Sequence, residues 1–478
     1  MTYEACVQLL GSRQMADGSV LAVSGSGDHA YFSETEFEQF TRAPQSLALG
    51  RQADLRSRFL LGSKAPSQGI KRLLASRLGA KRETVTTDPA LYLIVPTLQC
   101  AHSCRYCQVS RALDAQGHTM SAADLDAACD SIFESQAPTL TVEFQGGDPL
   151  LRFDLVERAI LRIQATNVLE KRRLRFVIAS TLHQLDERMC AFFKEHGVYL
   201  STSIDGPREL HNRNRPTPSR DSFERTLAGV ALARERLGHD AVASLMTTTK
   251  ASLSFPEEIV DEYVRLGFPE IFLRPLSSYG FAKRNQSLLG YSVDEFSAFY
   301  QRGLARVLHW NRQGVPIREV YASILLNKML STFDAGFVDL QSPTGAGTSA
   351  LVYNYDGYVY PSDEARMLAE TGDTSLRLGS IGTPLPELLK SPVRHDLISA
   401  SLVDQTEGCC DCAYRLFCAP NPVDAQAQHG HLHPPVQDTE HCQRHMGMFD
   451  QMFLAWRDAD EDVKDIFAEW ARPIAKQA

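Results

Sequence analysis

The sequence predicts an α/β protein built around a partial (β/α)6 barrel, and three observations lead to this prediction. Residues 91–275 alternate short apolar, β-branched runs with longer amphipathic stretches, which is typical of right-handed βαβ units and a parallel sheet. Six such units favour an open barrel over a closed one of eight. A chain of 478 residues also exceeds a single core and suggests about three domains of ~150 residues.

The barrel elements alternate in chain order, and each strand is followed by a polar turn and a helix. The candidate strands are Leu91–Pro96, Leu140–Gln145, Leu174–Ala179, Val198–Ile204, Ala241–Thr247 and Glu270–Pro275. The helices between them are Ala122–Ser135, Phe153–Thr166, Asp186–Glu195, Phe223–Arg236 and Pro256–Leu266. Ligands of such folds bind beyond the carboxyl ends of the strands, so residues that directly follow a strand are the first site candidates.

The segments outside the barrel follow other patterns. Residues 1–85 indicate a winged-helix-like module, with strands at Val20–Val23 and Ala30–Phe32, a helix at Glu34–Thr41 opened by Ser33, and helices at Leu55–Leu61 and Ile70–Leu78. The barrel occupies 86–280, followed by a helical bridge over 281–340 (Val293–Leu308, Arg318–Phe333), an irregular Cys-rich region over 341–445 and a closing helix over 446–478 (Met446–Trp470). In the Cys-rich region Leu351–Tyr355 and Tyr358–Tyr360 flank Asp356-Gly357, which predicts a hairpin.

Composition narrows the class of protein. With 49 basic and 58 acidic residues the formal net charge is −9, so the chain has no basic excess for binding a nucleic acid. Its longest apolar run is far shorter than the ~20 residues of a membrane helix. Residues 1–11 carry no export signal, and we therefore expect a cytoplasmic protein.

The 11 cysteines are unevenly distributed. An odd number in a large chain without an export signal makes a disulfide framework improbable. Cys6, Cys129 and Cys190 are isolated, and the latter two fall in helical patterns as small core residues. The other eight gather in residues 100–107 and 409–442. Such clustering indicates metal binding.

The first cluster directly follows the first barrel strand. Cys100, Cys104 and Cys107 are separated by three and two residues, a spacing that can bind three corners of a cubane iron–sulfur cluster and leave the fourth iron without a protein ligand. The alternative is a zinc site completed by His102 or by a distant residue.

Motifs at later strand ends distinguish these possibilities. The loop resembles the Cx3CxΦC signature of radical S-adenosylmethionine (SAM) enzymes, with Tyr106 as the aromatic residue, and Gln145-Gly146-Gly147-Asp148-Pro149 resembles their GGEP motif with Asp in place of Glu. The resemblance implies that SAM chelates the open iron and that these residues contact SAM; glycines permit the close backbone approach.

The third and fourth strand ends extend the resemblance. Ser201 to Pro207 with His211 to Arg215 is similar to the SxDGP…HxxxR stretch of anaerobic sulfatase maturases, which places Ser203 and Arg215 near the SAM carboxylate. On the third strand Ser180-Thr181 replaces the usual Thr-Asn-Gly, and Ser180 is the candidate SAM contact there. The alternative is that Asp205-Gly206-Pro207 is only a turn and Arg215 a surface residue. The family chemistry implied is transfer of one electron from a reduced [4Fe–4S] cluster to SAM, which releases a 5′-deoxyadenosyl radical.

The second cluster contains Cx2Cx5C and a later cysteine. Cys409, Cys412, Cys418 and Cys442 resemble the distal auxiliary [4Fe–4S] set of the SPASM domain of peptide maturases. The places of the nearer auxiliary set hold Thr344, Ser362 and Pro422 instead of cysteine, so we predict one auxiliary cluster. Cys410 is a spare thiol that could replace a neighbour. A four-Cys zinc ribbon is the alternative.

Asp363 follows Ser362, where related maturases carry a cysteine and then an aspartate that serves as base. We therefore identify Asp363 as the candidate proton acceptor. The alternatives are a solvated acidic turn or an Asp363–Arg366 pair at the start of a helix.

Residues 95–111 and 360–366 resemble the His-Xaa-Ser system group of radical SAM/SPASM maturases. The resemblance implies a precursor-peptide substrate whose leader strand residues 1–85 capture by edge addition, an external flavodoxin- or ferredoxin-type electron donor, and a side-chain crosslink as product. Two other functions stay open: a formylglycine-forming dehydrogenase similar to sulfatase maturases, and a non-enzymatic zinc-binding scaffold.

Overall fold

The computed structural model describes residues 6–64, 66–83, 88–113, 116–277, 279–334 and 336–472. Its centre is an eight-stranded sheet in the order β10-β9-β8-β7-β6-β13-β14-β15. The first five of these strands run parallel to one another: β6 (Leu91–Thr97), β7 (Thr139–Gly146), β8 (Arg173–Ala179), β9 (Val198–Ser203) and β10 (Val242–Leu245). The predicted partial barrel is thus confirmed, together with its first five strands.

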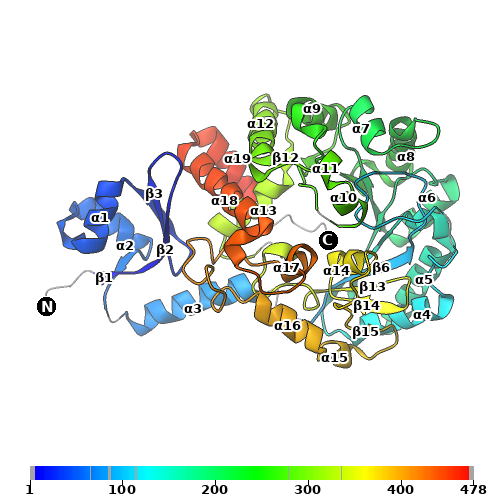
Figure 1. Cartoon of the computed structure of the whole chain (residues 1–478), viewed down its shortest axis with the longest axis horizontal. Coiled ribbons are helices and arrows are strands. Elements are labelled where there is room, and N and C mark those ends of the chain that lie inside the picture. Colours follow the sequence, from blue (N-terminus) through cyan, green and yellow to red (C-terminus); the bar gives the residue numbers. More distant parts are fainter. Residues whose placement is uncertain are drawn as a thin grey trace.

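Helices cover the outer face of this sheet and curve around it (Figure 1). They are α4 (Ala122–Ser131), α5 (Phe153–Glu170), α6 (Glu187–His196), α7 (Arg208–Asn214), α8 (Ser222–Leu237) and α9 (Pro256–Arg265). Alternate residues of β7 explain the packing: Leu140, Val142 and Phe144 are fully buried in the core shared with these helices. The residues between them, including Glu143, face the opposite side, where the strand ends lead to the candidate site.

The sixth predicted strand is much shorter than expected. β11 (Glu270–Ile271) pairs in parallel with β12 (Arg318–Glu319) and is not hydrogen-bonded to β10 in the described structure. The strand ends early because Leu273 N donates to the side chain of Glu319 in β12 at 3.0 Å instead of to a backbone carbonyl, and Pro275 has no N–H.

The predicted hairpin is confirmed and extends the barrel sheet. β13 (Ala350–Tyr353) and β14 (Tyr358–Tyr360) pair antiparallel, and β13 also pairs in parallel with β6. β15 (Gly379–Ser380) adds to β14. The region predicted as irregular also holds helices α14 (Asp363–Ala369), α15 (Leu385–Leu388), α16 (Pro392–Ala400) and α17 (Pro422–His429). The hairpin therefore brings α14 to the barrel.

The bridge and the closing segment are helical. They contain α10 (Gly280–Arg284), α11 (Gln286–Leu289), α12 (Val293–Arg312), α13 (Val320–Leu330), α18 (Glu440–Asp458) and α19 (Glu461–Ala471). The single closing helix expected over Met446–Trp470 is wrong, because Asp460 accepts a hydrogen bond from Val463 N at 3.0 Å and starts a new helix. No helix among the described residues is long and apolar enough to cross a membrane.

The N-terminal strands form a separate antiparallel sheet. It consists of β2 (Leu9–Gln14), β3 (Val20–Ser24) and β4 (His29–Phe32), and a short β1 (Cys6–Val7) pairs with β5 (Leu61–Gly62). The helices are α1 (Glu34–Arg42), capped by Ser33 as predicted, α2 (Leu49–Ser57) and α3 (Gln68–Arg82). A helix over Leu55–Leu61 is wrong, since α2 begins earlier and Leu61 lies in β5. Figure 1 shows β2 and β3 next to α18 and α19.

Candidate functional site

The first cysteine loop lies at the carboxyl end of β6. Two backbone hydrogen bonds hold it: Cys100 N donates to Ala112 O at 3.2 Å and Ser103 N donates to Pro216 O at 2.8 Å. Burial raises the pKa of the Cys104 thiol to about 12, and the thiol of Cys107 adds to the effect. The pKa of Cys100 is raised by burial and then by Asp148 and Cys104. The three thiols therefore lie within electrostatic range of one another in a desolvated site, and their binding of a cluster stays a prediction.

Two glycines at the end of β7 hold this loop by backbone contact. Gly147 N donates to Thr97 O at 2.9 Å. A Cβ atom on Gly147 would lie 2.2 Å from the carbonyl oxygens of both Leu98 and Gln99, and one on Gly146, whose φ is +123°, would lie 2.3 Å from Thr97 O. The Gly-Gly pair was predicted as a SAM contact. In the structure its visible function is to bring the backbone that carries Cys100 against β7.

Asp148 joins two strand ends. Its buried carboxylate accepts hydrogen bonds from Ser180 Oγ at 2.7 Å and Thr181 Oγ1 at 2.5 Å, and from Leu150 N at 3.2 Å. Burial raises the pKa of Asp148, while Thr181 and Ser180 oppose this shift. Asp148 and Ser180 were both predicted to contact SAM, and here they bind each other. Their contact with SAM stays a prediction.

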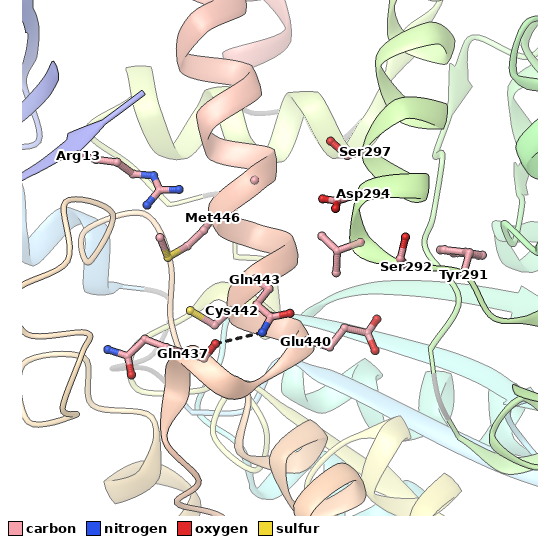
Figure 2. A pocket seen from close by; sticks show the side chains of 12 residues that line it. Arg13, Tyr291, Ser292, Asp294, Ser297, Gln437, Glu440, Cys442, Gln443 and Met446 are labelled. Carbon is pink, nitrogen blue, oxygen red and sulfur yellow. Dashed lines mark hydrogen bonds between the residues drawn. The ribbon is translucent and has the colours of Figure 1, made fainter. Parts of the chain in front are cut away.

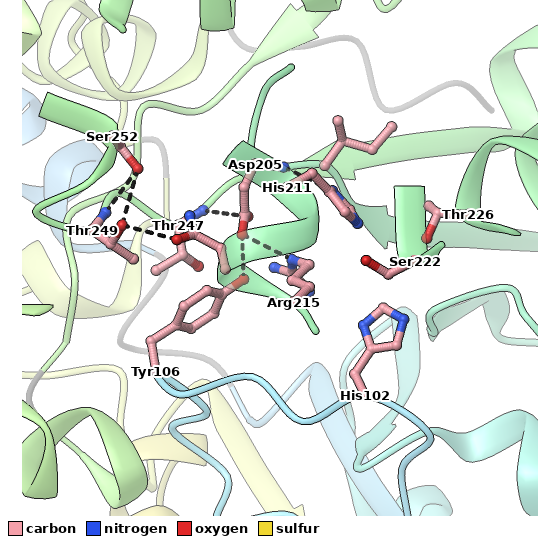
Figure 3. Close-up of polar contacts among 12 residues, drawn as sticks. His102, Tyr106, Asp205, His211, Arg215, Ser222, Thr226, Thr247, Thr249 and Ser252 are labelled. Atoms are coloured by element: carbon pink, nitrogen blue, oxygen red, sulfur yellow. Dashed lines mark hydrogen bonds and ion pairs between the residues drawn. The ribbon is translucent and has the colours of Figure 1, made fainter. Parts of the chain in front are cut away.

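A buried ion pair connects the cysteine loop with the fourth strand (Figure 3). Asp205 accepts a hydrogen bond from Tyr106 OH at 2.7 Å, and Arg215 Nε lies 3.1 Å from the same carboxylate oxygen. The Arg215 guanidinium also lies 5.2 Å from the centre of the Tyr106 ring. Burial disfavours the charge on Arg215, but Asp205 outweighs it and the pKa of Arg215 is raised. The alternative of a surface arginine beyond a simple turn is therefore wrong. Ser203, at the end of β9, is partly exposed.

His102, considered above as a zinc ligand, is directed to another histidine. Its Nε2 lies 3.1 Å from His183 Nε2, and His183 Nε2 is 3.2 Å from Thr226 Oγ1. Burial and then Arg215 lower the pKa of His102 to about 2, so the ring is neutral. Figure 3 shows His102 facing Ser222 and Thr226.

Asp363 is the first residue of α14, which Ser362 caps by accepting a hydrogen bond from Ala365 N at 3.2 Å. Its Oδ1 accepts a hydrogen bond from Arg366 Nε at 2.7 Å. The helix-start pair is thus present, and a solvated acidic turn is wrong because Arg366 is fully buried. Gln145 of β7 donates to Glu143 at 2.8 Å, and the Asp363 charge adds to the burial that raises the pKa of Glu143. Asp363 is therefore placed near the inner face of β7.

Glu364 is an ionisable residue that the sequence analysis did not select. The residue as a whole is partly exposed, but its carboxyl group is desolvated. This burial, and then the charges of Asp339 and Asp363, raise the pKa of Glu364 to about 7. A carboxyl group with a pKa near neutrality can accept or donate a proton. Only its position beside Asp363 could have drawn attention to it, because Asp339 is remote in sequence.

The second cysteine set combines a loop with a helix start. Tyr414 N donates to Cys412 Sγ at 3.4 Å, Cys418 N donates to Tyr414 O at 2.9 Å, and Cys442 N in the first turn of α18 donates to Thr439 Oγ1 at 3.1 Å. Burial raises the pKa of Cys418, and Cys442, Cys412 and Cys409 raise it further. The four thiols therefore lie within electrostatic range of one another, and their binding of an auxiliary cluster stays a prediction.

Cys410 has a different environment, since its thiol lies 3.5 Å from Asp411 Oδ2. Throughout the described ranges, no group of three or more His, Cys, Asp or Glu side chains is placed to hold a single metal ion.

A pocket of about 690 Å³ opens beside this second set (Figure 2). It lies between β2, the start of α12 and α18, and Arg13, Asp294, Glu440, Cys442 and Met446 are among its lining residues. Arg13 forms a two-pronged ion pair with Asp450 at 2.5 and 2.6 Å, and Tyr414 OH donates to the same carboxylate at 2.6 Å. The N-terminal sheet is thereby attached to the second cysteine set.

The barrel, the three-thiol loop and the strand-end contacts define the class of protein. Residues 94–270 match the model of the radical SAM superfamily. The chain thus contains a radical SAM domain; SAM and a [4Fe–4S] cluster are the cofactors of that superfamily.

The chain is also similar in sequence to individual curated proteins. The chain is 24% identical over 205 residues to the serine-type anaerobic sulfatase-maturating enzyme of Klebsiella aerogenes, covering 42% of this chain and 49% of that enzyme. It spans about half the length of the curated relatives it matches.

Two solved structures share the fold. The AdoMet-bound enzyme anSMEcpe is 17% identical with a TM-score of 0.65, over 79% of this chain and 99% of that one. Streptococcus suis SuiB bound to the precursor peptide SuiA is 12% identical with a TM-score of 0.55, over 91% of this chain and all (100%) of the other.

Proposed function

We propose that this enzyme is a maturase that abstracts hydrogen from a ribosomally made precursor peptide and installs a side-chain crosslink. The observation that carries the proposal is the presence of two separate thiol sets, three thiols in one loop after β6 and four shared between the loop at 409–418 and the first turn of α18. Three thiols leave one iron of a cubane open for SAM, and four complete a second cluster. SuiB, with the same overall fold, binds a precursor peptide. The His-Xaa-Ser group is the subgroup we propose.

The donors of both sets fit iron–sulfur clusters. Cys100, Cys104 and Cys107 are proposed to hold the SAM-binding cluster, and Cys409, Cys412, Cys418 and Cys442 one auxiliary cluster. When bound, the first cluster and SAM supply a 5′-deoxyadenosyl radical that removes a hydrogen atom from a C–H group. The protein contributes the positions of its side chains and a desolvated site, which limits side reactions.

The residues that we propose to surround SAM are Tyr106, Gln145 to Asp148, Ser180, Ser203 and Arg215. Asp363 is proposed to accept the proton that the substrate loses. Its Oδ1 is held by Arg366, so Oδ2 is available for this step. Glu364, with a pKa near 7, is the adjacent group that can receive the proton next.

The N-terminal sheet offers one strand edge for a leader peptide. At β4 the carbonyl oxygens of His29 and Tyr31 already accept hydrogen bonds from Arg58 at 2.9 Å and from Arg51 at 2.6 Å. At β2, Ser12 and Gln14 are exposed, and within the described structure nothing outside the sheet bonds to their backbone. We therefore assign edge addition of the leader to β2.

The decisive experiment is anaerobic reconstitution followed by chemical reduction with SAM. The proposal predicts about eight irons per chain for two cubanes, a brown colour and release of 5′-deoxyadenosine. A colourless protein that binds zinc and releases no 5′-deoxyadenosine would establish the scaffold alternative and refute the proposal.

The product is tested by mass spectrometry of a precursor peptide co-expressed with the enzyme. A crosslink removes two hydrogen atoms and suppresses fragmentation between the joined residues. Formylglycine instead reacts with a hydrazide, and such labelling would assign the enzyme to the sulfatase-maturase-like alternative.

The proton acceptor is tested by Asp363→Asn and Glu364→Gln, with Asp373→Asn, at a partly exposed residue after α14, as the control. Asp363→Asn is expected to keep SAM cleavage and to lose the crosslinked product. Wild-type product from Asp363→Asn together with loss of product from Glu364→Gln would transfer the role to Glu364.

A further inference from the structure

Arg366 is a cation without a complete set of partners. It is among the largest fully buried side chains, with 0% of its surface exposed. Nε donates to Asp363, but Nη1 and Nη2 are buried and have no hydrogen-bond partner in the described structure. A buried charge that lacks partners is costly, and natural proteins retain one where an anion or an acceptor completes the site.

The surroundings of Arg366 indicate where that anion lies. Ala365 and Leu368 of α14 share a hydrophobic cluster with Val95 and Leu98, and Val109 from the cysteine loop packs against it. Burial raises the pKa of the Cys107 thiol, and the charges of Arg111 and, more weakly, Arg366 oppose this shift. The helix that carries Arg366, α14, thus packs against the first cysteine loop, where the proposed cofactors form an anion.

Glu370, at the end of α14, is a second acidic group near Arg366, but no hydrogen bond joins the two side chains in the described structure. Its Oε2 accepts a hydrogen bond from Tyr355 OH at 3.1 Å, and burial raises its pKa against the effects of Tyr355 and of the Arg366 charge. Asp363 accepts a hydrogen bond from Nε of Arg366 through Oδ1, and in the described structure it bonds neither Nη group. The two Nη groups therefore remain free to donate, and a planar guanidinium presents them as a fork suited to thiolate, sulfide or carboxylate.

We propose that Nη1 and Nη2 of Arg366 hold the anion formed at the first cysteine loop, either the thiolate-ligated cluster itself or the carboxylate of SAM bound to it. Asp363 is then also a positioning residue, because its bond to Nε fixes the direction of the fork. The inference rests on the cofactor assignment of the proposed function. It adds that a residue of the C-terminal region, brought in by the β13–β14 hairpin, completes the first cofactor site.

The test compares Arg366→Met with Arg377→Met. Arg377 lies in the same region, where Nε donates to Tyr360 OH at 3.0 Å, and no contact with the cysteine loop is found for it in the described structure. Met preserves the aliphatic volume of Arg366 and removes its charge. Melting temperatures are measured without cofactor, and iron content, cluster midpoint potential and SAM affinity are measured after anaerobic reconstitution.

We expect Arg366→Met to have opposite effects on the cofactor-free and the reconstituted protein. Without cofactor, Arg366→Met leaves the melting temperature unchanged or raises it, because a half-paired buried cation is removed. With cofactor, two outcomes separate the sources of the anion. A more negative midpoint potential without SAM, or failure to load iron, assigns the fork to the cluster. An unchanged potential with a tenfold or larger loss of SAM affinity assigns it to the carboxylate.

Two further results would overturn the inference. One is wild-type iron content, potential and SAM affinity in Arg366→Met. The other is a lower melting temperature of the cofactor-free variant with no change after reconstitution, which would show that Arg366 has a packing role. These measurements use no peptide, so a loss of peptide modification alone would refute the proposed function and leave this inference standing. Arg366→Lys, which keeps the charge but lacks the fork, is expected to recover iron loading and only part of the SAM affinity.

Discussion

The two cysteine sets differ in the way they are built. The first is one short loop between β6 and the rest of the barrel, with three thiols and with Arg215 and Arg366 nearby. The second joins a loop at 409–418 to the first turn of α18 and has four thiols, with Arg13, Lys328 and Arg415 as nearby cations. A loop with three ligands leaves a coordination position for a substrate, whereas four ligands from two segments close the site.

The two sets also share one structural feature: in each, the backbone of a glycine from another segment lies against the cysteine loop. Gly146 at the end of β7 and Gly147 directly after it contact residues 97–99, next to Cys100. Gly11 of β2 contacts the backbone of Cys412 and Ala413. Each thiol set is therefore supported by a strand that is remote in sequence: a barrel strand for the first and an N-terminal strand for the second.

The largest predicted effect comes from removing one thiol of each set. Cys104→Ser should abolish 5′-deoxyadenosine formation, because the cluster that binds SAM is lost. Cys442→Ser should retain SAM cleavage while about four of eight irons are lost and no crosslinked peptide is made. Iron analysis, product chromatography and peptide mass spectrometry measure the three quantities. Loss of SAM cleavage in Cys442→Ser would show that the two sets are not functionally separate.

The glycine contacts give the next largest effect. An alanine Cβ at residue 147 would lie 2.2 Å from two carbonyl oxygens, whereas at residue 11 it would lie 2.8 Å from Ala413 N and Cα. We expect Gly147→Ala to lower the free energy of unfolding by about 3 kcal/mol or more, and Gly11→Ala by about 1–2 kcal/mol.

Denaturant unfolding of the cofactor-free variants measures the loss, and reconstitution identifies which cluster is affected. Gly25→Ala, at a site with open space around the Cβ position and, like residues 11 and 147, no positive φ, controls for the substitution itself. Equal losses for residues 147 and 11 would contradict the packing argument.

The sequence predicts those parts of the site that depend on local spacing. The Asp356-Gly357 hairpin depends on residues within one turn, and the structure confirms it. The three cysteines of residues 100–107 and the Gly-Gly pair after β7 are likewise found from short motifs, and their binding of a cluster and of SAM stays a prediction. Asp205 was treated as part of a turn, because its partners Tyr106 and Arg215 come from two other segments. Arg366 was considered only as a partner of Asp363, since its proximity to Cys107 exists only after β13 has paired with β6.

The smallest predicted effect concerns Cys410. It tests whether a fifth thiol can replace one of the four ligands of the second set. Its thiol contacts Asp411, and it contributes to the raised pKa of Cys409 but is not among the groups that shift Cys418 or Cys442. Cys410→Ser should therefore leave iron content at the wild-type level and change the free energy of unfolding by no more than about 0.5 kcal/mol. The matched variant Cys409→Ser, one residue away, should lose the auxiliary cluster. If Cys410 can instead act as a ligand, Cys409→Ser will retain its full iron content, and only the double variant Cys409→Ser/Cys410→Ser will lose the cluster. The second set would then resemble the first in having an exchangeable coordination position.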